Sequence, residues 1–147
     1  MKHDKPTHID MSVELYRNPG DGWDGNLLVV NRGNHHQVFE KIPDDSQSHT
    51  ISWTLTGNAG EGEFCALDDA SNPGFSWLVR QPGEKVFRQL RHHGKTISLQ
   101  NHHHDKSSEG IWHYQLFARF GDKIFGIPLT FSCGASMTSP NPTIKNT

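Results

Sequence analysis

The sequence predicts an all-β domain built as a sandwich of two sheets. Apolar and polar residues alternate with a period of two along most of the chain, which is typical of strands that cover a core with one face. Clusters of Gly, Pro, Asn and Asp interrupt these runs about every ten residues, as in sandwiches and barrels. No window of about twelve residues keeps an apolar stripe of helical period without a Gly or Pro. We therefore expect about nine to eleven short strands and little helix.

Four runs show the clearest alternation, and in each the apolar residues are expected to face the core. These are residues 8–15, 51–55, 112–119 and 125–131. Shorter candidate strands fill the intervals, at residues 26–31, 36–40, 63–67, 75–80, 85–90 and 96–99. Trp53, Trp77 and Trp112 lie in such runs between apolar neighbours, so we expect them to be largely buried.

The C-terminal residues 134–147 fit two alternatives. They are polar and contain Pro140 and Pro142. Because a proline is tolerated at the start of an edge strand, this segment either closes a sheet as a short edge strand or is a flexible tail. No internal repeat or linker divides the chain, and residues 1–147 are expected to form a single domain.

The composition argues against nucleic-acid and membrane partners. Fourteen Lys and Arg residues against sixteen Asp and Glu give a formal net charge of -2, without a long block of like charge. This balance lacks the basic face that nucleic-acid or membrane-surface binding needs. No apolar stretch approaches the length of about 20 residues that a spanning helix needs, and the first residues do not resemble an export signal. We expect a cytoplasmic protein in which Cys65 and Cys133 are free thiols.

Eleven histidines are the most unusual feature of the composition, and five of them fall within residues 92–104. Neutral imidazole is a common metal ligand, so a metal site is one interpretation of this segment. A strand through residues 95–100 would, however, separate the first two of these histidines from the last three by roughly 20–30 Å. The interpretation that we favour is solvated loop histidines without a metal.

The metal alternative rests on a resemblance to cupins. His102, His104 and Glu109 have a His-x-His-x4-Glu spacing that resembles the first metal motif of that family. Residues 121–128 resemble the start of its second motif, although no histidine follows Pro128 to provide the third imidazole. The resemblance implies a metal site formed by His102, His104 and Glu109.

A second resemblance concerns the cysteines. The spacing of Cys65, Trp77 and Cys133 resembles that of the two cysteines and the core tryptophan of immunoglobulin variable-type domains, with Phe131 at the position of their corner tyrosine. The resemblance implies an immunoglobulin-like, antiparallel sandwich. It also implies a disulfide between the sheets, which would contradict a cytoplasmic location.

The last strand-like element carries a third resemblance. Residues 139–146, Ser-Pro-Asn-Pro-Thr-Ile-Lys-Asn, follow the aromatic strand pair at residues 112–131. This ending is similar to that of small bacterial β-sandwich proteins such as the DP-EP family. The resemblance implies the sandwich fold and a bacterial source, and it implies no activity.

The sequence contains none of the common catalytic signatures. We find no Gly-x-Ser-x-Gly, no His-Glu-x-x-His, no phosphate-binding Gly-rich loop and no Cys-x-x-Cys, so we predict neither an enzyme nor a cofactor. The predicted function is a binding or assembly module that contacts another copy or a partner protein through a sheet edge or its end loops. Trp23, in a loop of glycines and acids, is the candidate contact residue. The alternative is a cupin-like ligand- or metal-binding protein that uses loop histidines.

Overall fold

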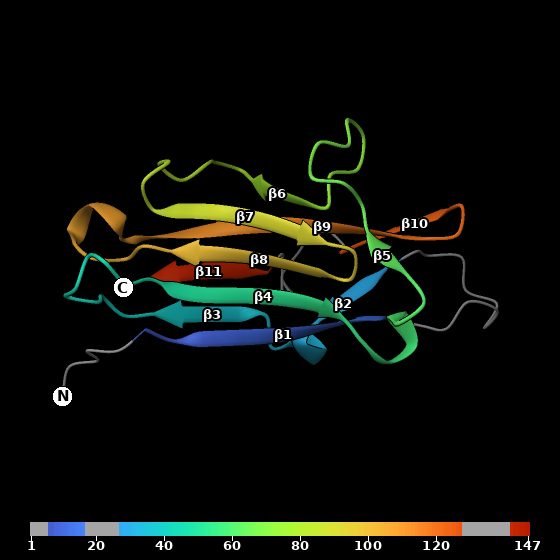
Figure 1. The fold of residues 1–147 in the computed structure, drawn as a ribbon, viewed down its shortest axis with the longest axis horizontal. Coiled ribbons are helices and arrows are strands. Elements are labelled where there is room, and N and C mark those ends of the chain that lie inside the picture. Colours follow the sequence, from blue (N-terminus) through green and yellow to red (C-terminus); the bar gives the residue numbers. More distant parts are fainter. Residues whose placement is uncertain (1–5, 17–26, 128–141) are drawn as a thin grey trace, which may run out of the picture.

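Two sheets stack face to face in the computed structural model, which describes residues 6–16, 27–127 and 142–147. The strands run along the long axis of the molecule (Figure 1). The first sheet contains β1 (His8–Leu15), β2 (Leu28–Val30), β4 (His49–Leu55), β7 (Phe87–His93) and β8 (Thr96–Asn101). Its strand order is β2-β1-β4-β8-β7. This arrangement confirms the predicted all-β sandwich.

The second sheet is organised around its longest strand. It contains β3 (His36–Phe39), β5 (Glu63–Phe64), β6 (Phe75–Leu78), β9 (Gly110–Phe120), β10 (Lys123–Gly126) and β11 (Thr143–Asn146). The order is β10-β9-β11-β3, and β5 and β6 also pair with β9. The helical segments of the described residues are three short 3-10 turns, η1 (Asn31–Gly33), η2 (Gly57–Ala59) and η3 (Lys106–Ser108). None of them has the length or apolar character needed to cross a membrane.

The predicted alternation of buried and exposed residues is confirmed along the principal strands. The buried apolar residues of β1, β4 and β9 are Met11, Val13, Leu15, Ile51, Trp53, Leu55, Trp112, Tyr114, Leu116 and Ala118. Trp77 is only partly buried and packs against the edge of this core. Trp23 and Cys133 lie outside the described residues. The disulfide that the immunoglobulin resemblance implies is wrong for Cys65, where the predicted free thiol is confirmed. Cys65 is buried as a free thiol, and this burial raises its pKa.

Two strand pairs correct the expectation of wholly antiparallel sheets. β1 pairs with β4 in parallel, and β3 pairs with β11 in parallel. A parallel pair needs a long crossover connection. The segment between β1 and β4 is such a crossover. It contains β2, which pairs with β1, and then β3, which belongs to the second sheet.

The C-terminal strand is a second correction. Residues 143–146 form neither an edge strand nor a tail, because β11 lies between β9 and β3 and bonds to both. Ile144 is fully buried in the core. Pro142, which lacks an N–H, uses its carbonyl to accept a hydrogen bond from the Tyr114 N–H at 3.3 Å. Residues 134–141 lie outside the described part of the chain.

The centre of the core holds a polar contact between the sheets. The Trp53 indole N–H in β4 donates to the Tyr114 hydroxyl in β9 at 2.9 Å, and both side chains are fully buried. Phe75 stacks on the Tyr114 ring, with the centroids 5.4 Å apart. Burial raises the pKa of Tyr114, so this hydroxyl stays protonated. The contact satisfies the indole N–H, which would otherwise be costly to bury.

We expect Tyr114→Phe and Trp53→Phe each to lower the free energy of unfolding by about 1–3 kcal/mol, because the first leaves a buried donor unsatisfied and the second creates a cavity. The double variant should lose less than the sum of the two, with a coupling of about 0.5–3 kcal/mol. Urea denaturation of the four proteins measures this coupling. Strict additivity would show that the hydrogen bond between the sheets contributes no stability.

Candidate functional site

The strands carry polar side chains into the interior at one end of the sandwich. His49, Asn101, His103 and Asn146 are buried there, at the left in Figure 1. Each side chain lies on the same face as the buried apolar residues of the strand that contains or precedes it, because side chains two residues apart share a face. His49 precedes Ile51 in this way, and Asn146 follows Ile144. We call this region, formed by residues 40–49, 85–88, 101–109 and 146–147, the histidine end.

Two asparagines join the sheets at this end. The Asn101 amide in β8 donates to the Asn146 side-chain oxygen at 2.8 Å, and the Asn146 amide donates back at 3.1 Å. The Asn146 amide also donates to the Ser108 carbonyl at 2.9 Å. A buried amide is tolerated when its hydrogen bonds are made. The pair therefore fixes the loop that contains η3 against the C-terminal strand.

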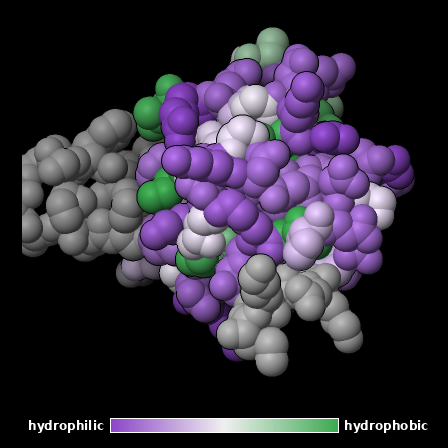
Figure 2. Space-filling view, turned by 90° about the vertical axis from the view of Figure 1, so that its left-hand side faces the viewer, coloured by the Kyte–Doolittle hydropathy of each residue, from purple (hydrophilic) through white to green (hydrophobic). Residues whose placement is uncertain are grey.

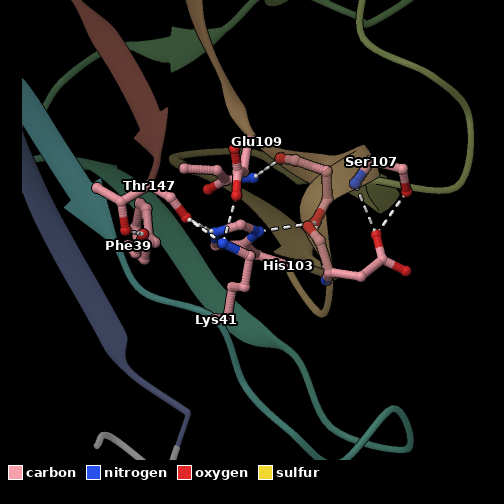
Figure 3. Close-up of polar contacts among 9 residues, drawn as sticks. Phe39, Lys41, His103, Ser107, Glu109 and Thr147 are labelled. Carbon is pink, nitrogen blue, oxygen red and sulfur yellow. Dashed lines mark hydrogen bonds and ion pairs between the residues drawn. The ribbon is translucent and has the colours of Figure 1, made fainter.

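His103 lies at the centre of the histidine end (Figure 3). Its Nε2 lies 2.7 Å from the main-chain oxygen of Thr147, and its Nδ1 lies 2.7 Å from the Ser108 hydroxyl. Because a main-chain oxygen only accepts, Nε2 carries a hydrogen. Burial lowers the pKa of His103, which favours the neutral ring. In that state Nδ1 can only accept, and the single hydrogen of the Ser108 hydroxyl is shared between Nδ1 and the Asp105 carbonyl, which lies 2.8 Å from the same oxygen.

A serine hydroxyl directed at an imidazole is also the arrangement of a nucleophile and its general base. Here the serine has a structural role. Ser108 is 4% exposed, and its oxygen accepts from the Asp105 N–H at 3.4 Å in the capping of η3. The Asp105 carboxylate in turn accepts from the Ser107 N–H at 2.9 Å. These contacts hold the serine side chain in the capping of η3.

His49 is held as one neutral tautomer. Its Nδ1 accepts from the Thr7 N–H at 2.9 Å, and its Nε2 donates to the Glu40 carbonyl at 2.8 Å. A proton on Nδ1 would point at the Thr7 N–H, and the two donors would repel each other. Burial lowers the pKa of His49, in agreement with this geometry.

The structure corrects the expectation that the histidine triplet is solvated. His103 is fully buried, and His102 and His104 are half-buried with their ring centroids 5.8 Å apart. Nδ1 of His104 donates to the Ile42 carbonyl at 3.0 Å, and its Nε2 is buried without a hydrogen-bond partner among the described residues. Burial lowers the pKa of His102, and Arg88 and His104 lower it further.

The three residues of the cupin-like motif do not come together as a ligand set. Glu109 forms an ion pair with Lys41, and this contact lowers the pKa of the Glu109 carboxyl. Lys41 also donates to the main-chain oxygen of Thr147 at 3.1 Å. In the part of the chain that the structure describes, no three His, Cys, Asp or Glu side chains are placed to hold a metal ion. His92 and His93 lie at the opposite end, next to the turn between β7 and β8.

Two surface hollows lie at opposite ends of the sandwich. The hollow at the histidine end has a volume of about 150 Å³ and is lined by Lys85, Val86, Arg88, His102, His104, Asp105, Ser107 and Ser108. The hollow at the other end has a volume of about 400 Å³ and is lined by Glu61, Gly62, Glu63, Gly94, Lys95, Arg119 and Gly121. Acids and bases are balanced in the second hollow, whereas the first has two fixed positive charges against one carboxylate.

Sequence reasoning missed His49, Asn101 and Asn146. The signal was present in the period-two pattern, because all three occupy inward positions next to buried apolar residues. The same pattern places His103 on the inward face and its neighbours His102 and His104 on the outward face. A prediction that assigns only apolar residues to the core overlooks these positions, because it places every polar residue in solvent.

Comparison with protein-family models, with curated proteins and with solved structures finds no match for this chain. The resemblances to the DP-EP family and to immunoglobulin domains therefore stay predictions. The fold and the chemistry of the histidine end carry the functional argument.

The free energy of unfolding should fall as the pH is lowered from 7 to 5. The unfolded chain takes up protons on its histidines near pH 6.5, whereas the folded state resists protonation of His49 and His103, so stability is complete above that pH and declines below it. Each such group contributes a slope of at most about 1.4 kcal/mol per pH unit.

His49→Gln should flatten this dependence, because it removes one of the resisting groups. His93→Gln is the matched control, since His93 is exposed at the opposite end, and it should keep the wild-type slope. Urea denaturation at several pH values measures the slopes. An unchanged slope in His49→Gln would contradict the assignment of a neutral, buried His49.

Proposed function

We propose that this protein is a non-catalytic binding module that recognises a partner through the loops of its histidine end. The observation that carries the proposal is a surface hollow whose walls are fixed from below by buried hydrogen bonds. Binding surfaces that are ordered beforehand lose less entropy when a partner arrives. The side chains that line this hollow include those of Arg88, His102 and His104.

The character of the surface supports a polar partner. Figure 2 views the molecule from the histidine end, and hydrophilic residues cover most of that face. Lys85 and Arg88 are exposed there beside the half-buried histidines. Charges on an interface rim guide encounter and select the partner by complementarity. We therefore infer recognition by charge and hydrogen bonds rather than by an apolar patch.

The edges of the first sheet favour this surface over the predicted edge pairing. The edge strand β7 has a register shift between Arg88 and Arg91, and Gln89 has a positive φ of 57°. The edge strand β2 spans three residues and runs into the left-handed residues Asn31 and Arg32. Bulges, charges and short length all oppose pairing with another strand. In this sheet the end loops are therefore better suited than the strand edges to bind a partner.

We further propose a reducing, cytoplasmic location, as the sequence predicts. The buried thiol of Cys65 supports it, because such a group is inert and needs no oxidising compartment. A partner for this module is then a cytoplasmic protein or a second copy of the chain.

The first test is partner binding by charge-reversal variants. We would capture partners on the immobilised full chain, purify the partner found and measure its affinity by titration calorimetry. Arg88→Glu should weaken binding by about tenfold or more, because a charge pair at the contact becomes a repulsion. Lys95→Glu, at the opposite end, should bind as the wild type does. Equal binding by Arg88→Glu, or chemical turnover of the bound partner, would contradict the proposal.

The second test addresses the metal-binding alternative. His104 has an Nδ1–H bonded to a carbonyl and an unused Nε2, which is how metal-binding histidines are oriented. The positive charge of Arg88 beside His102 opposes a cation, so we expect zinc at low excess to leave the melting temperature unchanged. A rise with zinc that the double variant His102→Gln, His104→Gln abolishes would favour the metal site, since a ligand of the folded state raises stability.

A further inference from the structure

The two hollows differ in the charge that they present to a ligand. At the far end, Lys95 and Arg119 are offset by Glu61 and Glu63. At the histidine end, Lys85 and Arg88 face the single carboxylate of Asp105. That carboxylate already accepts hydrogen bonds from the N–H and hydroxyl of Ser107. The lining of this hollow therefore has one positive charge more than its carboxylate neutralises.

The two cations are available to a ligand. Among the described residues, neither Lys85 nor Arg88 forms an ion pair. The Arg88 Nε donates to the Lys85 carbonyl at 3.1 Å, which holds the guanidinium against the wall of the hollow. This contact leaves the terminal nitrogens of the guanidinium to bond an incoming group. A guanidinium prefers planar, two-pronged contacts with oxyanions.

The lining of the hollow also contains two half-buried imidazole rings, those of His102 and His104. His104 also lines the hollow, and its Nε2 is buried without a partner among the described residues. The nitrogen itself is closed to solvent, so a ligand in the hollow meets the half-buried His104 ring rather than Nε2.

We infer that the hollow at the histidine end binds a phosphoryl group carried by the partner, an inference that rests on the proposed function. Lys85 supplies a point charge and Arg88 supplies paired donors, while the rings of His102 and His104 line the hollow beside them. A phosphoryl group has three terminal oxygens and carries more negative charge than a carboxylate, so it can accept two bonds from the Arg88 guanidinium and a third from Lys85. The volume of about 150 Å³ suits a single compact group rather than a whole metabolite.

The experiment is a titration of the full ¹⁵N-labelled chain with inorganic phosphate, followed by NMR at constant ionic strength. Amide shifts should move at residues 85–88 and 102–108 and stay fixed around the far hollow. Arg88→Gln should weaken phosphate binding by about tenfold, because a charge-assisted hydrogen bond is lost. Lys95→Gln is the matched control and should bind phosphate as the wild type does. Acetate at equal concentration should produce no saturable shift.

Several outcomes would overturn the inference. They are shifts of equal size at both ends, saturable binding of acetate as strong as that of phosphate, or an Arg88→Gln variant with unchanged affinity. If phosphate fails to bind while the captured partner still requires Arg88, the binding module stands and the phosphoryl assignment fails. If phosphate binds as expected while Arg88→Glu keeps the partner, the hollow stands as an anion site and the proposed function fails.

Discussion

The hydrogen bond from Trp53 to Tyr114 is the contact on which the mutual placement of the two sheets depends. Apolar side chains press the sheets together without direction, because the hydrophobic effect is proportional to buried area alone. A hydrogen bond has a direction, and this one joins the central strands β4 and β9. The ring of Phe75 packs against both partners. The polar pair therefore selects one relative position among the many that an apolar interface would accept.

The histidine end follows from that placement. Once β4 and β9 are aligned, β8 and β11 bring Asn101 and Asn146 into contact at the end of the core. Their amides meet only when both sheets have the correct register, so the two inter-sheet contacts reinforce each other. The loop after β8 is then fixed over its length by His103 and Ser108. The alternation of inward and outward side chains that forms the core therefore also orders the loops of the histidine end.

Much of this fold could be predicted from the sequence, because a period of two determines which side chains share a face. The inward phase of Met11, Val13 and Leu15 and the burial of Trp53 and Trp112 follow directly from it. Partner strands do not follow, since alternation is the same in parallel and antiparallel pairs. The interior position of β11 was missed for that reason. His103 was missed because a polar residue in an inward position is recognised only through its partners, and those are distant in sequence.

The pairing of β3 with β11 has a consequence for how the protein is made. Among the described residues, β3 bonds to β11 alone, and more than a hundred residues lie between the two. During synthesis, residues 36–39 leave the ribosome long before residues 143–146 exist. Contacts of such high sequence separation form slowly, because the loop between them must close first. The nascent chain thus carries an unpaired strand until residues 143–146 have been made, and chaperones that shield exposed strands have a reason to bind this protein before that point.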